Sequence, residues 1–138
     1  MITLSEVQAA RERLAKVVHK TELTYSRTFS ELAGNEVYLK NENLQKTGSF
    51  KIRGAFNKIA SLTDEEKQCG VIASSAGNHA QGVALGATLY GIPSTVVMPA
   101  GAPLAKVMAT RGYGAEVVLH GAAYDDAYAK AVEIQKKT

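Results

Sequence analysis

The sequence predicts an α/β fold: a doubly wound, open parallel sheet preceded by an N-terminal extension that contains helices and a strand. Three observations predict it. Largely apolar runs of strand length occur at 70–74, 94–98 and 115–119, and each is followed by a stretch with helical periodicity. Such runs are typical of parallel strands that are buried on both faces. The 138 residues are 46% hydrophobic and 21% charged, a balance that allows a buried core.

The N-terminal extension is expected to span residues 1–48. Its first helix runs to about residue 16, because apolar residues recur at steps of three and four. Either of two capping boxes can start this helix, Thr3 with Glu6 or Ser5 with Gln8. After it we expect a polar stretch, a short helix closed by Gly-Asn, and a strand, at 19–27, 29–33 and 36–40 respectively.

The remaining residues, 49–138, are expected to form a small α/β domain. Its first helix covers about 50–62 with Ser49 as the N-cap, and a short capped helix begins at 63–66. Pro103 favours the first turn of a later helix. The helices that alternate with the strands are expected at 78–90, 103–112 and 124–136. Ligands of doubly wound sheets bind beyond the carboxyl ends of the strands. The candidate site therefore lies in the loops that follow the strands, at 74–79, 99–101 and 120–121.

The composition excludes several function classes. The net charge of +3 comes from dispersed basic residues, without the cluster that a nucleic-acid surface shows. The single cysteine, Cys69, permits no internal disulfide and favours a reducing compartment. Cysteine and histidine residues are too far apart for a zinc site, and no apolar segment suits a secretory signal or a membrane span. We therefore expect a cytoplasmic protein that binds neither nucleic acid nor membrane nor metal.

Lys51 is a candidate nucleophile at the expected start of a helix. An amine that attacks an aldehyde must be neutral for part of the time. The positive end of the helix dipole and burial beside Phe50 would both lower the pKa of Lys51. A lysine at such a position is nevertheless more often a solvated surface residue, so position alone does not decide.

The surrounding stretch carries more information, and its residues are Lys46-Thr47-Gly48-Ser49-Phe50-Lys51-Ile52-Arg53-Gly54-Ala55. It resembles the lysine motif of fold-type II pyridoxal-phosphate (PLP) enzymes, in the branch of threonine dehydratase (threonine ammonia-lyase), serine dehydratase and serine racemase. Ile52 stands where the cysteine synthase branch usually has an aspartate, which argues against that branch. The resemblance implies that Lys51 binds PLP covalently and that Phe50 packs against one face of the pyridine ring.

A second stretch follows a predicted strand and opens a helix: Ser75-Ala76-Gly77-Asn78-His79-Ala80-Gln81-Gly82. Unpaired N–H groups at a helix start attract anions such as a carboxylate, although Asn78 taken alone could be only a helix cap. The octapeptide resembles the substrate loop of the same family. The resemblance implies that Asn78 binds the ring hydroxyl of the cofactor. It also implies that the substrate-binding residues are Ser75, Ala76, Gly77, Asn78 and His79, which hold the carboxylate partly through backbone amides.

The resemblance extends over nearly the whole chain, including Met98-Pro99, Ala102-Pro103 and Lys106-Val107. We interpret these three dipeptides as structural: a strand end, a helix start and a solvated helix face.

The resemblance implies β-elimination and deamination of L-threonine, L-serine or both, which gives 2-oxobutanoate or pyruvate and ammonia. Lys51 would remove the α-proton. Eukaryotic serine racemases have a serine as second acid/base two residues before the asparagine, and Ala76 stands there in this chain. A methyl group cannot move a proton, so the sequence favours a dehydratase over a racemase. The implied context is amino-acid metabolism, with isoleucine biosynthesis as one option beside a catabolic role.

Full-length relatives carry a glycine-rich phosphate loop and a polar partner for the pyridine nitrogen further along the chain, and neither is found in these 138 residues. We therefore expect an N-terminal portion of such an enzyme, inactive or weakly active by itself. The alternative is a non-catalytic α/β module that binds PLP weakly or not at all. The expected partner is a small amino-acid substrate, and the family's dimers and tetramers make a homo-oligomer a further option.

Overall fold

A three-stranded parallel sheet forms the centre of the computed structural model, which describes residues 1–137. The strands lie in the order β3-β4-β5, with bounds Val71–Ser74, Ser94–Met98 and Glu116–Leu119. The register places Ala73 opposite Val96 and Val96 opposite Val117. Strands that follow one another in the sequence are therefore neighbours in the sheet.

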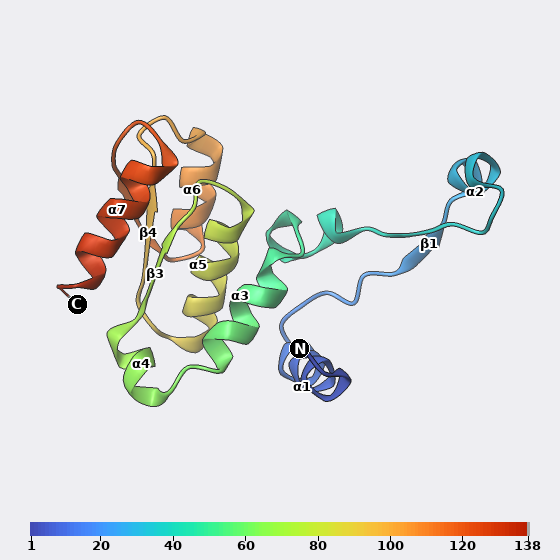
Figure 1. Cartoon of the computed structure of the whole chain (residues 1–138), viewed down its shortest axis with the longest axis horizontal. Coiled ribbons are helices and arrows are strands. Elements are labelled where there is room, and N and C mark those ends of the chain that lie inside the picture. Colours follow the sequence, from blue (N-terminus) through green and yellow to red (C-terminus); the bar gives the residue numbers. More distant parts are fainter. Residues whose placement is uncertain (138) are drawn as a thin grey trace.

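Helices cover both faces of this sheet, as expected for a doubly wound layer (Figure 1). On one face lie α5 and α6, and on the other lies α7, with bounds Asn78–Tyr90, Leu104–Gly112 and Tyr124–Gln135. In the central strand, Val96 and Met98 pack toward α5 and α6, while Val97 packs against α7. All three side chains are completely buried, which confirms the prediction of burial on both faces for β4.

Two further helices precede the sheet, α3 at Lys51–Ala60 and α4 at Asp64–Cys69. The apolar face of α3 buries Ile52, Phe56 and Ile59. This helix lies against α5 at a very short distance, because Gly82 of α5 has no side chain. A Cβ on Gly82 would lie 3.2 Å from the carbonyl of Lys51. The contact places the start of α3 directly beside the first turns of α5.

The N-terminal part forms an arm whose middle projects away from the sheet (Figure 1). Its elements are α1 at Leu4–Leu14, β1 at Leu23–Tyr25, α2 at Arg27–Ala33, β2 at Tyr38–Lys40, η1 at Glu42–Leu44 and η2 at Lys46–Gly48. The two strands pair in antiparallel fashion, with Thr24 opposite Leu39. Leu14 of α1 packs on Ile52 and Phe56, which joins α1 to α3.

Most predicted elements agree with the structure to within one or two residues. The capping box at the start of α1 is Thr3 with Glu6, and the helix ends at Leu14 rather than near residue 16. The expected strand at 36–40 is confined to Tyr38–Lys40. The polar stretch expected at 19–27 contains β1, a strand that was not predicted from the sequence. This strand has only three residues, all exposed, and exists through its pairing with β2.

Two helix starts also differ from the prediction. The helix α3 begins at Lys51, so Phe50 rather than Ser49 occupies the N-cap position, although Phe50 has helical backbone angles, which an N-cap residue ordinarily lacks. Ser49 still helps the helix start, since its Oγ accepts a 3.3 Å hydrogen bond from the N–H of Lys51. Pro103 is the N-cap residue of α6 rather than part of its first turn.

Candidate active site

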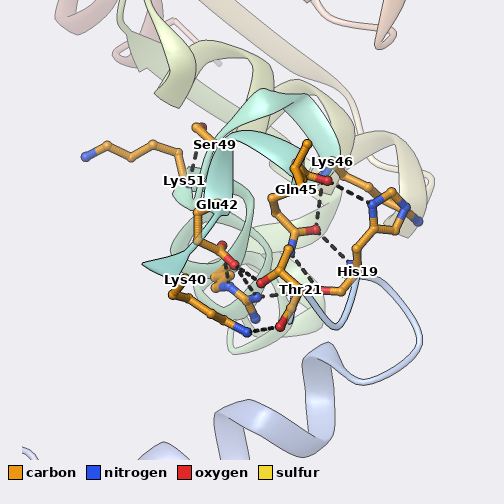
Figure 2. A network of polar contacts seen from close by, with 10 residues as sticks. His19, Thr21, Lys40, Glu42, Gln45, Lys46, Ser49 and Lys51 are labelled. Atoms are coloured by element: carbon orange, nitrogen blue, oxygen red, sulfur yellow. Dashed lines mark hydrogen bonds and ion pairs between the residues drawn. The ribbon is translucent and has the colours of Figure 1, made fainter. Parts of the chain in front are cut away.

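Lys51 is the first residue of α3, and its side chain is exposed. Its ammonium lies 5.1 Å from the centre of the Phe50 ring and makes no hydrogen bond or ion pair within residues 1–137. The side chain points away from the polar network that precedes the helix (Figure 2). Phe50 itself is 58% exposed, so the predicted burial of Lys51 beside this ring is wrong for the described chain. Lys51 is instead an accessible amine above an aromatic face.

A polar network fixes the segment that leads into Lys51 (Figure 2). Arg53 donates two 2.8 Å hydrogen bonds to the carboxylate of Glu42, in a bidentate ion pair. Thr21 donates a third hydrogen bond to the same carboxylate, at 2.6 Å. The guanidinium of Arg53 lowers the pKa of Glu42 from 4.5 to about 2, with help from Thr21 and against the effect of partial burial. Arg53 lies two residues after Lys51, so this ion pair ties the first turn of α3 to Glu42 at the end of the arm.

The buried side chain of Gln45 makes a second tie, which joins the turn before Lys51 to the segment that follows α1. Its Oε1 accepts hydrogen bonds from the N–H groups of His19 and Lys46 at 2.8 and 2.9 Å, and its Nε2 donates to the carbonyl of His19 at 2.8 Å. No role for Gln45, Glu42 or Arg53 was predicted from the sequence. Only their position inside or beside the Lys51 motif could have drawn attention to them.

The turn just before Lys51 has unusual backbone geometry. Thr47 has φ 63° and Gly48 has φ 67°, both in the left-handed region. Glycine tolerates this conformation, whereas a β-branched residue such as threonine rarely adopts it. The hydroxyl of Thr47 is buried and finds no hydrogen-bond partner in the part of the chain that the structure describes. Local strain of this kind is often found next to functional residues, and here the surrounding network holds it in place.

The second predicted motif forms the turn between β3 and α5. The N–H of Ser75 donates to the carbonyl of Val97 and extends the β3–β4 ladder by one bond. The Oγ of Ser75 then accepts a 3.3 Å hydrogen bond from the N–H of Gly77. Gly77, not Asn78, is the N-cap residue of α5, and it provides no side-chain cap. Among residues 1–137, the backbone amides of Asn78, His79 and Ala80 have no acceptor.

These unpaired amides lie at the start of a 13-residue helix, a position where backbone N–H groups generally attract anions. Asn78 and His79 are exposed there, while Ala76 is half-buried and packs on the core between the sheet and α5. The pKa of His79 is lowered by its partial desolvation and by the positive charge of Lys51. The contact at Gly82 places the start of α5, and with it the end of this turn, close to the backbone of Lys51. The fold therefore brings together the two motifs, which are 24 residues apart at Ser75 and Lys51.

Both motifs lie on an open surface of this chain. A groove of about 790 Å³ runs along the outer edge of β3 and reaches His79, but its lining includes neither Lys51 nor Asn78. Within the described residues no group of histidine, cysteine and acidic side chains could hold a metal ion. No helix between residues 1 and 137 is long and apolar enough to cross a membrane.

The residues of this surface fit a PLP group. Such a cofactor requires an accessible lysine, an aromatic side chain beside it, and donors for its ring oxygen and for the substrate carboxylate. Lys51, Phe50, Asn78 and the unpaired amides of the turn are groups of these kinds. The comparisons agree with this fit: the family model described as pyridoxal-phosphate dependent enzyme matches residues 14–138. The chain therefore belongs to the family of PLP-dependent enzymes.

Similar proteins include threonine ammonia-lyases and, among solved structures, a serine racemase. The L-threonine ammonia-lyase of Thermotoga maritima is 59% identical over 138 residues, which cover all of this chain and 34% of the relative. The catabolic L-threonine dehydratase of Escherichia coli K12 is 55% identical over 133 residues, or 96% of this chain and 40% of the relative. Among solved structures, maize serine racemase has a TM-score of 0.93 and 37% identity, over 98% of this chain and 41% of that one. The chain thus spans about a third to two fifths of the length of these proteins.

Proposed function

We propose that this chain provides the lysine-bearing part of a PLP-dependent lyase that converts L-threonine to 2-oxobutanoate and ammonia. One observation carries the proposal. The start of α3, which carries the accessible amine of Lys51, lies beside the first turns of α5, whose leading backbone amides have no acceptor among the described residues, and the missing side chain of Gly82 allows this approach. An amine and an anion-binding position next to each other suit a substrate with a carboxylate and a reacting α-carbon.

Each residue then has a defined task. Bound PLP would withdraw electrons from the α-carbon of the amino acid. Lys51 would hold the cofactor covalently, and after displacement by the substrate amine it would take the α-proton. Phe50 would cover one face of the ring, and Asn78 would donate to its oxygen. The turn at Ser75, Ala76, Gly77, Asn78 and His79 would bind the carboxylate.

Several narrower inferences belong to the same proposal. We infer L-serine as a second substrate, because only a methyl group distinguishes it from threonine. We also infer a homo-oligomer, a cytoplasmic location and a role in amino-acid metabolism that includes isoleucine biosynthesis as one option. The division into residues 1–48 and 49–138 is a proposal too. It is supported by the projecting middle of the arm and by the separate core around the sheet (Figure 1).

Two other candidates are weaker. A serine racemase is favoured by the high TM-score of the maize enzyme. Ala76 opposes it, because its methyl group packs on the core and cannot donate a proton from the second face of the substrate. A non-catalytic module is favoured by the exposure of Lys51, since an open site without a phosphate loop would bind PLP weakly.

The test is a titration of the purified chain with PLP, followed by the visible absorbance of the lysine-bound cofactor. Borohydride reduction and peptide mapping then locate the label. Lys51→Ala should abolish the label, and Lys58→Ala, which changes another lysine of the same helix, should not. A threonine deamination assay completes the experiment. Label spread over many lysines, or equal labelling of Lys51→Ala, would rule out the assigned role of Lys51.

A further inference from the structure

Lys106 on α6 contacts the candidate site from a different element. Its ammonium donates a 2.9 Å hydrogen bond to Oδ1 of Asn78, which is 28 residues earlier in the sequence. The sequence pattern indicated a solvated helix-face residue, and the structure corrects this interpretation. Lys106 is half-buried, and its neighbour Val107 belongs to the core between α5, α6 and the sheet.

The backbone of Lys106 is held firmly. Its N–H donates to the carbonyl of Pro103 at 2.8 Å, and its carbonyl accepts a 2.8 Å hydrogen bond from the hydroxyl of Thr110. Thr110 is completely buried. The long side chain of Lys106 therefore starts from a fixed point in the first turn of α6, and it reaches the first residue of α5 from there.

This contact determines which end of the Asn78 amide faces Lys106. An ammonium group only donates hydrogen bonds, so it must meet the amide oxygen and not the nitrogen. The nitrogen of Asn78, with its two N–H donors, makes no hydrogen bond to any described residue. Without Lys106 the amide could rotate by half a turn and present its oxygen instead. The amide oxygen of Asn78, turned toward the cofactor in place of the nitrogen, would repel the electron-rich ring oxygen of that cofactor.

We propose that Lys106 is a positioning residue: it fixes the orientation of the Asn78 side chain, so that its N–H donors remain available to the cofactor. The inference rests on the proposed function for what the donors bind, but the orientation itself is a property of the chain without cofactor. Lys106 acts through Asn78 and does not itself take part in proton transfer. Its removal should therefore affect cofactor binding more than the fold.

Two variants test this role. Lys106→Met keeps the length of the side chain and removes the donor, whereas Lys106→Arg keeps a charged donor. The matched control is Lys130→Met on α7, because Lys130 is also half-buried and also makes one 2.9 Å hydrogen bond, to Glu133. All variants are first compared by thermal unfolding, so that a loss of fold is recognised.

The first measurement is nuclear magnetic resonance of the side-chain NH2 group of Asn78 in the chain without PLP. Lys106→Met should lower the order parameter of this group, while Lys106→Arg and Lys130→Met should leave it close to the original value. An unchanged order parameter in folded Lys106→Met would overturn the inference, whether or not the chain binds PLP.

The second measurement is the PLP titration, with the pH dependence of the visible band as a spectroscopic readout. Lys106→Met should weaken PLP binding about three- to tenfold, as expected for the loss of one oriented hydrogen bond. It should also shift the pH dependence, and Lys106→Arg should largely restore both. In Asn78→Ala, the Lys106→Met change should add little. Full additivity of the two changes would contradict action through Asn78. A chain that takes up no PLP at Lys51 would refute the proposed function alone, since the resonance of Asn78 still decides the role of Lys106.

Discussion

Replacement of Glu42 by glutamine should destabilise the fold in a strongly pH-dependent way. Glu42→Gln removes the charge that faces Arg53 at 2.8 Å, in a pair whose side chains are only 17% and 33% exposed. The pKa of Glu42 falls from 4.5 to about 2 on folding, mainly through the hydrogen bonds from Arg53. A shift of this size corresponds to at most about 3 kcal/mol of unfolding free energy. Because the pair is partly exposed, we expect a loss of about 1 to 2 kcal/mol at pH 7.

The sign of the pH dependence follows from the direction of the shift. The folded-state pKa is depressed, so the contribution of Glu42 is fully present above its unfolded pKa of 4.5 and disappears as the pH falls toward 2. Between these values the difference between the original chain and Glu42→Gln should shrink by up to about 1.4 kcal/mol per pH unit. Part of the difference should remain at a pH of about 3, and the two chains should become nearly equal in stability only as the pH approaches about 2.

The assay is urea unfolding at several pH values from about 3 to about 7, with Glu31→Gln as the control. The ion pair of Glu31 with Arg27 has the same chemistry at 2.7 Å, but its side chains are 64% and 85% exposed. Its loss should cost less than about 0.5 kcal/mol. Equal losses in both variants at neutral pH, or a loss in Glu42→Gln that does not change with pH, would refute the assignment of this network as a tie between the arm and α3.

Four further substitutions test the geometry around Lys51 and the segment before it. Gly82→Ala should lose about 1 kcal/mol of unfolding free energy in urea, because overpacking against a fixed backbone outweighs the helix propensity of alanine. Gly54→Ala in α3 meets open space and should gain up to about 1 kcal/mol, so equal stability of the two variants would contradict the close contact. Lys51→Ala should raise the pKa of His79 in a nuclear magnetic resonance titration, because a nearby positive charge is removed. An unchanged pKa would contradict the proximity of Lys51 and His79. Gln45→Ala should cost about 2 kcal/mol in urea, because it removes a buried amide and leaves the part-buried backbone N–H and carbonyl of His19 without their partner. A loss near zero would show that water replaces the amide.

Features that depend on neighbouring residues could be predicted from the sequence. The central strand was predicted at its observed bounds, Ser94–Met98, because an apolar run with turn residues on both sides leaves little choice. The capped start of the helix at 63–66 was also predicted, and Thr3–Glu6 was one of two boxes expected for α1, since such caps join residues three positions apart. The family was recognised from the two motifs around Lys51 and Asn78, and the family comparison confirmed it. The roles of the individual site residues remain predictions.

Features that depend on distant partners could not be predicted. The strand β1 has no apolar pattern of its own and forms because β2 pairs with it. The burial expected for Lys51 was wrong, because the described residues place little around Phe50. In both cases, local propensity does not report which surfaces another part of the chain will cover.

The candidate site shows the same difference between features that depend on neighbouring residues and contacts between distant residues. The sequence by itself determined most of the elements, the order of the two motifs and the family. Only the tertiary structure paired Glu42 with Arg53, Lys106 with Asn78, and Gly82 with the backbone of Lys51. Such partners are 11 to 31 residues apart, and they meet only after the helices have packed on the sheet. Hydrophobic burial drives that packing without specifying pairs, so the polar partners are decided by the relative placement of whole elements.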